Sequence, residues 1–522
     1  MTAVRPPHAR PAEPARRPHR VIIGVDVGTT AAKVVAFGVD TLWRHVAVRE
    51  YPLLEPVAGQ AVQDPDVVVE AMLAALSDCV AASAGTEVIG VSVSAAMHGL
   101  VGLDAALRPL TPLVTWADGR AIDVSRGLRA AGLAAELHAA TGTPVHPMSP
   151  LTKLVWFARH EPAVWTATRW WVGLKDLVLH RLTGELVTEL SSASATGLMD
   201  LRSRGWSPAA VDLSGARPDQ LPPILPTTAV RGLAPDVASR VGLPAGTPVV
   251  LGAADGPLGN LGTGAMSPGV VGMSLGTSGA VRTIVEAPPA ALHPALFCYA
   301  LTESAWAVGG AVSNGGIVVR WAGESLAPDL DGVPGGATAD ERLLDLAASV
   351  PPGSDGLLML PYLLPERAPL WDPDLSGALW GLRRRHTRAH VVRAAVEGVA
   401  LQLASIVDTI DAVVPVTSVR ATGGALRSPV WRHVLAAVLG RPLVVAGAAE
   451  GSALGAAALG LHALGHAPVL AEATAMLCGP AAHATDSVPT DRDAAAVYTR
   501  TRAVLPELLR AMATTDAILA GR

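Results

Sequence analysis

The chain of 522 residues is longer than one ordinary hydrophobic core can organise, so its length predicts two large domains. Hydrophobic residues make up 50% of it and charged residues 16%, a globular composition that excludes a largely disordered chain. The net charge of −5 gives no basic footprint for nucleic acid, and the 3 cysteines form neither a disulfide framework nor a metal-ligand pattern.

The first 20 residues are rich in proline and arginine and have no apolar segment, which excludes a secretory signal and predicts a disordered tail. The Ala/Gly-rich run over residues 448–465 is too short and too polar to span a bilayer. We therefore expect a cytoplasmic protein that binds neither a membrane nor a nucleic acid.

The first predicted element is a buried strand over residues 21–27, which a Gly-Thr-Thr turn joins to a second apolar strand over residues 31–39. Helical spacing of apolar residues predicts a helix over 64–82, and 88–94 has the pattern of another buried strand. Further helices are predicted over 151–159 and 175–182. The first half is thus expected to be an α/β domain that begins with a hairpin.

The same order restarts in the second half. A strand over 247–253 leads to Asp255, and a strand over 270–275 ends in a Gly-Thr-Ser turn before a further strand. Helices are expected over 313–323, 389–414, 429–439 and 491–518, with a strand over 418–422. The repeat predicts two similar α/β domains, 21–247 and 248–522, with a nucleotide in the cleft between them.

The two turns are the main evidence for a nucleotide. A tight turn presents backbone N–H groups and small hydroxyls to one point, which suits a phosphate, although such a turn can also merely close a hairpin. The candidate phosphate-binding residues are Gly28, Thr29, Thr30 and Lys33 in the first turn, and Gly276, Thr277 and Ser278 in the second. A Gly-Lys dipeptide, a His-Arg-Asp triplet and an early G-x-G-x-x-G are absent from the sequence, which argues against P-loop, protein-kinase and Rossmann folds.

Two aspartates stand where a phosphoryl-transfer site needs carboxylates. Asp26 closes the first strand and is a candidate to hold hydrated Mg²⁺ against the phosphates, the alternative being a cap of its own turn. Asp255 follows a strand and is a candidate base for an attacking hydroxyl, and it too could contact Mg²⁺ through water. The alternative for Asp255 is an ordinary helix N-cap.

Two further motifs suit the rest of the ligand. Gly423, Gly424 and Ala425 follow a strand, and Ser428 precedes a helix, so a flat base or ribose could approach the backbone there; close packing is the alternative. Met97 and His98 follow the strand 88–94, at the end of a strand where ligands bind in α/β folds; a structural histidine is the alternative. The scarce lysines, Lys33, Lys153 and Lys175, all lie in the first half.

Taken together, these residues resemble the FGGY carbohydrate kinases from about residue 21 to 505. The phosphate motifs of that family are similar to Asp26-Val27-Gly28-Thr29-Thr30 and Gly276-Thr277-Ser278-Gly279, the adenosine motif to Gly423-Gly424-Ala425, and Glu366-Arg367-Ala368-Pro369 to a further family motif. The stretches Ser94-Ala95-Ala96-Met97-His98, Ser149-Pro150-Leu151-Thr152-Lys153 and Gly309-Gly310-Ala311-Val312-Ser313-Asn314 resemble the gluconate kinase branch.

The resemblance implies two RNase H-like domains of the actin-like ATPase architecture that close over ATP, Mg²⁺ and a polyol. It implies that Asp255 is the catalytic base and that Met97 and His98 line the sugar site. Gluconate carries a carboxylate, so a cation is expected there; Lys153 is the first candidate, with His146, Arg120 and Arg367 as alternatives. The expected reaction is phosphorylation of D-gluconate to 6-phospho-D-gluconate. A homodimer is a further expectation for this protein.

Two other functions stay open on the sequence. One is a kinase of the same fold for xylulose or another ketose or polyol. The other, from a different class, is a non-catalytic actin-like ATPase or a sugar sensor.

Overall fold

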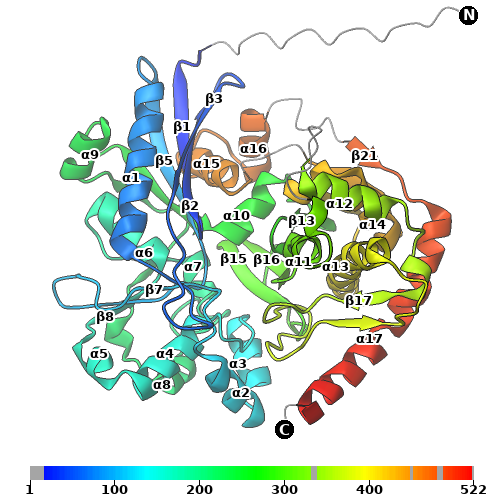
Figure 1. Ribbon diagram of the computed structural model, residues 1–522. Helices are drawn as coiled ribbons and strands as arrows, with labels where there is room; N and C mark the ends of the chain where they lie inside the picture. Colours follow the sequence, from blue (N-terminus) through cyan, green and yellow to red (C-terminus); the bar gives the residue numbers. More distant parts are fainter. Residues whose placement is uncertain (1–16, 331–337, 447–450, 479–485, 520–522) are drawn as a thin grey trace, which may run out of the picture.

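The computed structural model describes residues 17–330, 338–446, 451–478 and 486–519; most of the expected N-terminal tail, residues 1–16, lies outside this range. Two mixed β-sheets with helices on their faces lie side by side and form an N-terminal and a C-terminal domain (Figure 1). The expected fold class, two α/β domains, is confirmed.

The N-terminal sheet contains six strands: β1 (Arg20–Val27), β2 (Ala31–Gly38), β3 (Arg44–Glu50), β5 (Glu87–Ala95), β11 (Val230–Gly232) and β12 (Pro248–Ala254). Strands β1, β2 and β3 pair antiparallel, whereas β5 and β12 extend the sheet in parallel from β1. Apolar residues of β1 and β5 are buried because helices cover both faces of this sheet.

The C-terminal sheet contains seven strands: β13 (Val270–Leu275), β14 (Gly279–Val285), β15 (Phe297–Thr302), β16 (Ala305–Val312), β19 (Ser418–Thr422), β20 (Leu443–Val445) and β21 (Asp486–Val488). Here β13, β14 and β16 are antiparallel neighbours, and β19 and β20 follow β13 in parallel. Strand β15 is added at the edge of β16, and β21 at the edge of β20.

The two sheets share one topology. The order β3-β2-β1-β5-β12 in the first matches the order β16-β14-β13-β19-β20 in the second, with the same sequence of antiparallel and parallel pairs. The expected duplication of an α/β unit is therefore present, and each unit begins with a hairpin closed by a Gly-Thr turn.

The expected domain boundary between residues 247 and 248 needs correction. Strand β12 pairs with β5 of the N-terminal sheet, so that sheet ends at Ala254. The sequence pattern restarts at this strand, which suggested a boundary before it. However, a strand that joins a sheet in parallel can come from far along the chain, so the pattern does not show which sheet the strand enters. As a result, Asp255 lies at the junction of the two domains and not inside the second one.

Helices complete both domains. Those of the N-terminal half are α1 (Pro65–Ala82), α2 (Ile122–Ala130), α3 (Ala134–Thr141), α4 (Pro150–His160), α5 (Pro162–Ala167), α6 (Leu174–Thr183), α7 (Leu190–Ser194), α8 (Pro208–Ser214) and α9 (Pro235–Val241). Those of the second half are α10 (Asp255–Gly262), α11 (Gly316–Leu326), α12 (Ala339–Ala348), α13 (Arg388–Asp411), α14 (Pro429–Leu439), α15 (Gly451–Ala463), α16 (Leu470–Cys478) and α17 (Arg492–Leu519).

Short strand pairs connect these elements: β4 (Val62–Gln63) with β7 (Leu113–Val114), β6 (Val101–Leu103) with β8 (Trp170–Val172), β9 (Thr188–Glu189) with β10 (Ile224–Leu225), and β17 (Leu358–Leu360) with β18 (Ala378–Trp380). The expected helix over 313–323 begins three residues later, at Gly316, because residues up to Val312 belong to β16. Helix α1 begins where Asp64 accepts hydrogen bonds from the N–H groups of Asp66 and Val67.

Helices α10 and α15 join the two domains. Helix α15, orange in Figure 1, comes from late in the chain and lies beside the blue strands of the N-terminal sheet. A Cβ at Gly455 of α15 would lie 2.0 Å from the carbonyl oxygen of Leu258 in α10, and a Cβ at Gly24 of β1 would lie 2.1 Å from that of Ala453. Only glycine permits backbones to approach this closely, so these glycines fix how α15 packs against the other two elements.

One described helix, α13, is long and apolar enough to cross a membrane by length and composition. Most of its residues are buried in the C-terminal core, where they pack with strands of the second sheet and with α14. A buried core helix can have the same length and apolar composition, so these two properties do not identify α13 as a membrane span.

Candidate active site

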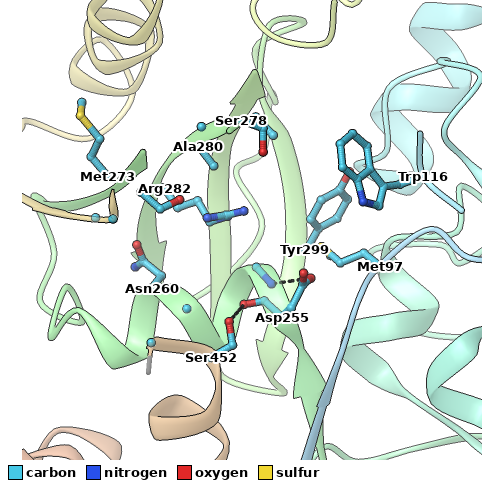
Figure 2. A pocket seen from close by; sticks show the side chains of 18 of the residues that line it. Met97, Trp116, Asp255, Asn260, Met273, Ser278, Ala280, Arg282, Tyr299 and Ser452 are labelled. Carbon is cyan, nitrogen blue, oxygen red and sulfur yellow. Dashed lines mark hydrogen bonds between the residues drawn. The ribbon is translucent and has the colours of Figure 1, made fainter. Parts of the chain in front are cut away.

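A cavity of about 420 Å³ lies between the two domains, where the ends of β1, β5 and β12 face the strands β13, β14 and β19. Residues predicted from the sequence to form the site and found in its wall are Asp26, Thr29, Lys33, Met97, His98, Asp255, Ser278 and Gly423. Figure 2 shows part of this wall, with Asp255 at its floor and the side chains of Tyr299, Trp116 and Met97 to one side.

Asp26 ends the cavity-facing part of β1. Its Oδ1 accepts a hydrogen bond of 2.9 Å from the hydroxyl of Ser94 on the neighbouring strand β5. Burial, with a further contribution from the charge of Asp255, raises the pKa of Asp26 to about 6. The charge of Asp255 therefore acts on Asp26 within the same cavity.

Asp255 is the first residue of α10, directly after β12. Its Oδ1 accepts a hydrogen bond of 2.8 Å from the backbone N–H of Gly256, which fixes the carboxylate. Burial raises the pKa of Asp255, and the guanidinium of Arg282 is the largest influence that opposes this rise. A buried carboxylate with a raised pKa is a suitable acceptor for a proton.

Beneath this floor lies Lys175, the third of the scarce lysines. Its Nζ donates a hydrogen bond of 2.8 Å to the carbonyl oxygen of Ala253, and it lies 3.4 Å from Oε1 of the buried Glu189. Lys175 is therefore a buried support of the strand that delivers Asp255, and it does not line the cavity.

In the first turn, Gly28 donates a backbone hydrogen bond of 3.0 Å to the carbonyl oxygen of Ala31, which closes the hairpin. Thr29 lines the cavity and its Oγ1 accepts a hydrogen bond of 2.8 Å from the indole of Trp116. The carbonyl oxygens of Gly28 and Thr30 face outward, because Tyr51 donates to both of them. Gly28 and Thr30 thus shape the turn, and Thr29 and Lys33 present side chains to the cavity.

In the second turn, too, one residue lines the cavity and the others hold the turn in place. Ser278 lines the cavity, whereas the carbonyl oxygens of Gly276 and Thr277 accept hydrogen bonds from the N–H groups at the start of α11. The turn is thereby attached to the first turn of a helix, which holds its outer side in place.

The glycines after β19 separate in the same way. Gly423 lines the cavity with φ 118°, and a Cβ there would lie 2.2 Å from the carbonyl oxygen of Leu275. Gly424 and Ala425 lie in a short 3₁₀ turn behind it. Ser428 caps α14, since its Oγ accepts from the N–H of Val430 at 3.2 Å. Only Gly423 of this predicted adenosine motif reaches the cavity directly.

His98 has an unusual backbone for a non-glycine residue, with φ 65°. Its Nδ1 lies 2.7 Å from the carbonyl oxygen of Ala195, so Nδ1 carries the proton and donates it. Burial lowers the pKa of His98 to about 3, which keeps the ring neutral and leaves Nε2 as an acceptor. Beside Met97, this ring is suited to accept a hydrogen bond from a sugar hydroxyl.

Lys153 does not line the cavity. Its side chain is fully buried, and Nζ donates to the carbonyl oxygens of His98 (2.6 Å), Thr115 (2.8 Å) and Val114 (3.3 Å). All three hydrogens of the ammonium group are used, so Lys153 lies behind His98 in the cavity wall and does not face the cavity. The sequence could not show this, because α4 packs against segments 38 to 55 residues away.

Of the three alternative cations, one reaches the cavity. Arg120 makes two hydrogen bonds to Asp118, at 2.7 and 2.9 Å, and His146 is buried against the carbonyl oxygen of Glu366. Arg367 lines the cavity, and its guanidinium carbon lies 4.6 Å from the centre of the Trp116 ring.

One functional candidate, Arg282 of β14, was not predicted from the sequence. It lines the cavity beside Asp255, and Figure 2 shows its side chain pointing toward Tyr299. The available signal was the single charged residue of this strand, four residues after Ser278. The cavity thus combines two carboxylates, three basic side chains, small hydroxyls and a neutral histidine, an arrangement suited to phosphoryl transfer to a hydroxyl.

Comparison with known proteins agrees with this geometry. The profile for the N-terminal domain of the FGGY family of carbohydrate kinases matches residues 21–262, and the profile for its C-terminal domain matches residues 271–464. The gluconokinase of Bacillus subtilis (strain 168) is 37% identical over 454 residues, which cover 85% of this chain and 88% of that protein.

Two further relatives are similar over most of their length. The xylulose kinase of Escherichia coli (strain K12) is 30% identical over 444 residues, covering 84% of this chain and 89% of that protein. The crystal structure of the gluconate kinase from Lactobacillus acidophilus superposes with a TM-score of 0.87 at 31% identity, covering 96% of this chain and 99% of that one.

Proposed function

The chain belongs to the FGGY family of carbohydrate kinases, and on that premise we propose that it transfers the γ-phosphoryl group of ATP to the 6-hydroxyl of D-gluconate. The observation that carries the mechanism is the place of Asp255, which shares one cavity with Thr29 of the first turn and Ser278 of the second. A hydroxyl that reaches Asp255 is therefore close to both turns that suit phosphates.

In this mechanism Asp255 accepts the proton of the attacking hydroxyl. The N–H of Gly256 holds the carboxylate in place, and Arg282 favours its ionised form. Thr29, Lys33 and Ser278 provide hydroxyl and ammonium groups for the triphosphate, and Gly423 lets the nucleoside approach the backbone. Met97 and His98 line the part of the cavity that holds the polyol.

The residues present also fit Mg²⁺. This ion keeps several waters and takes one or two carboxylates together with substrate phosphates, so a full protein cage is not required. Asp26 and Asp255 supply two carboxylates, whereas the described residues contain no group of three or more metal-ligating side chains. When bound there, Mg²⁺ would neutralise phosphate charge, and Asp26 would be its main protein contact.

Gluconate is the preferred acceptor for two reasons. The gluconokinase relative is 37% identical, against 30% for the xylulose kinase. In addition, the cavity contains two arginines, which suit the carboxylate of a sugar acid. A neutral ketose has no carboxylate for them to bind. A xylulose kinase activity is the second candidate, and the similarity to a xylulose kinase is the observation that favours it.

The test is ADP release from ATP and Mg²⁺ by the purified protein with gluconate, xylulose, ribulose, glycerol or no sugar. Wild type and Asp255→Asn are compared. The substitution removes the base but keeps the shape, so kcat with gluconate should fall roughly 10²- to 10⁴-fold. Gluconate affinity, measured separately by calorimetry, should change little.

Each other outcome has a definite meaning. Turnover with xylulose and not with gluconate would keep the mechanism and refute the substrate. ATP hydrolysis that needs no sugar and survives Asp255→Asn would refute the kinase proposal and favour a non-phosphorylating ATPase.

We further propose that the enzyme is cytoplasmic and that it can form a homodimer. Light scattering of the purified chain would check the oligomeric state.

A further inference from the structure

We propose that Arg282 binds the carboxylate of the sugar acid and is the residue that selects an acid over a neutral sugar. This inference rests on the proposed gluconate kinase function and adds the residue that recognises the charged end of the substrate. It arises from the state of the Arg282 side chain, which differs from that of every other arginine discussed above.

The guanidinium of Arg282 lies in the cavity wall. Within the part of the chain that the structure describes, its buried Nε has no hydrogen-bond acceptor, and no ion pair involves the guanidinium. Arg367, by contrast, donates from Nε to the hydroxyl of Ser313 at 3.2 Å and from Nη2 to the carbonyl oxygen of Val312 at 2.8 Å. Arg282 is therefore the arginine with free donors.

A buried cation without hydrogen bonds is costly, and its usual remedy is an anionic partner with two acceptor oxygens. Burial lowers the pKa of Arg282, but a guanidinium remains charged at any physiological pH. The carboxylate of Asp255 opposes this fall in the pKa, yet its Oδ1 accepts a hydrogen bond from Gly256. A carboxylate supplied by the ligand would satisfy the donors that the protein leaves unused.

The surroundings of the guanidinium favour the sugar half of the cavity. A Cβ built at Gly256 would lie 3.0 Å from Nη2 of Arg282 and 3.1 Å from the sulfur of Met97, so both side chains adjoin the same glycine. The guanidinium carbon lies 5.9 Å from the ring centre of Phe297, which stacks on Tyr299 at 4.3 Å. Tyr299 in turn meets the ring of His98 at 5.6 Å.

The two arginines of this half have different opposite charges. Burial lowers the pKa of both; the carboxylate of Glu366 is the largest influence that opposes this for Arg367, and that of Asp255 is the largest for Arg282. Beside Arg282, which has no ion pair among the described residues, the carboxylate of an aldonic acid would add a second negative charge. The phosphates already have Lys33 and the two turns on the other side of the cavity.

A phosphate oxygen of ATP is the competing anion for Arg282, and binding without nucleotide separates the two. We would measure gluconate affinity by calorimetry in the absence of ATP for wild type, Arg282→Met and Arg282→Lys. If Arg282 binds the carboxylate, gluconate affinity should fall roughly 10²-fold in the methionine variant, because a charge-assisted contact is lost. The lysine variant should lose less, since it keeps the charge but not the two-pronged geometry.

The same variants are then assayed with a neutral acceptor, xylulose, and for binding of ADP. The ratio of kcat/KM for gluconate to that for xylulose should fall by a similar factor, with ADP affinity unchanged. Arg181→Met, which removes an arginine from a surface ion pair with Asp236, is the matched control and should change neither quantity. The melting temperature of Arg282→Met without ligand should not fall, because no hydrogen bond to the described residues is lost.

Unchanged gluconate affinity in Arg282→Met, together with a lower kcat for every acceptor, would overturn the inference and assign Arg282 to the phosphates. That result would leave the gluconate kinase function intact, because wild-type turnover with gluconate is measured independently. If the wild type phosphorylates neutral sugars and no sugar acid, both the proposed substrate and this role of Arg282 are wrong.

Discussion

The ammonium group of Lys153 donates a hydrogen bond of 2.6 Å to the carbonyl oxygen of His98, a residue whose φ is 65°. The same group reaches the carbonyl oxygen of Thr115 at 2.8 Å, next to Trp116 in the cavity wall. One buried side chain therefore joins the two segments that carry His98 and Trp116. We therefore assign Lys153 the role of a positioning residue for these two segments.

Replacing Lys153 with methionine keeps the length of the side chain but leaves the carbonyl oxygens of His98 and Thr115 without this donor. Each unpaired buried carbonyl costs roughly 1–3 kcal/mol, so the free energy of unfolding should fall by about 2–6 kcal/mol. Because His98 loses its support, the KM for gluconate should rise more than the KM for ATP. Denaturant unfolding and steady-state kinetics would measure both effects.

Lys33→Met is the matched comparison for that experiment. Lys33 lies opposite Asp26 on the first hairpin and lines the cavity, so its loss should raise the KM for ATP and leave gluconate binding nearly unchanged. Equal effects of the two substitutions on both substrates would contradict the separate roles assigned to these lysines.

The sequence could predict what depends on local pattern. Both Gly-Thr turns, the hairpins that they close and the place of Asp255 after a strand follow from short stretches of apolar residues and glycines, and the structure contains them. The duplicated topology could be inferred because these local patterns occur twice. The helix 429–439 and the strand 418–422 were predicted with the bounds that the structure has.

What depends on long-range contact could not be predicted. The membership of β12 in the first sheet rests on its pairing with β5, whose residues lie more than 150 positions earlier. Lys153 is buried because carbonyl groups of two distant segments surround its ammonium. Arg282 differs from Lys153, since β14 turns its one charged side chain into the cavity. Only the folded sheet shows that its Nε has no acceptor among the described residues.

Gly423 and Gly424 are neighbours with different requirements. A Cβ at Gly423 would lie 2.2 Å from the carbonyl oxygen of Leu275, and a residue with a side chain would have to adopt the φ of 118° found there. A Cβ at Gly424 would have its nearest neighbour at 3.6 Å. Gly423→Ala should cost roughly 1–3 kcal/mol of stability and raise the KM for ATP, because the loop at the cavity must move. Gly424→Ala should be nearly neutral in both thermal melting and kinetics. Equal tolerance of the two would mean that the backbone of Gly423 does not shape the nucleotide site.

The final prediction concerns pH. Asp26 has a pKa of about 6, raised by burial and by the charge of Asp255, and a protonated carboxyl group is a poor ligand for Mg²⁺. The affinity for Mg²⁺ and ADP should therefore be full above pH 7 and decline as the pH falls through about 6. Calorimetric titration between pH 5 and 8 measures this decline without any turnover.

Two substitutions should move the midpoint of that decline in opposite directions. Asp255→Asn removes a negative charge that raises the pKa of Asp26, so the midpoint should shift to lower pH. Ser94→Ala removes a hydrogen bond that lowers this pKa, so the midpoint should shift to higher pH. If both variants keep the wild-type midpoint, the group that titrates is not Asp26. In that case the protonation that weakens nucleotide binding must occur outside the pair of aspartates, and Asp26 would lose its assignment as the main contact of Mg²⁺.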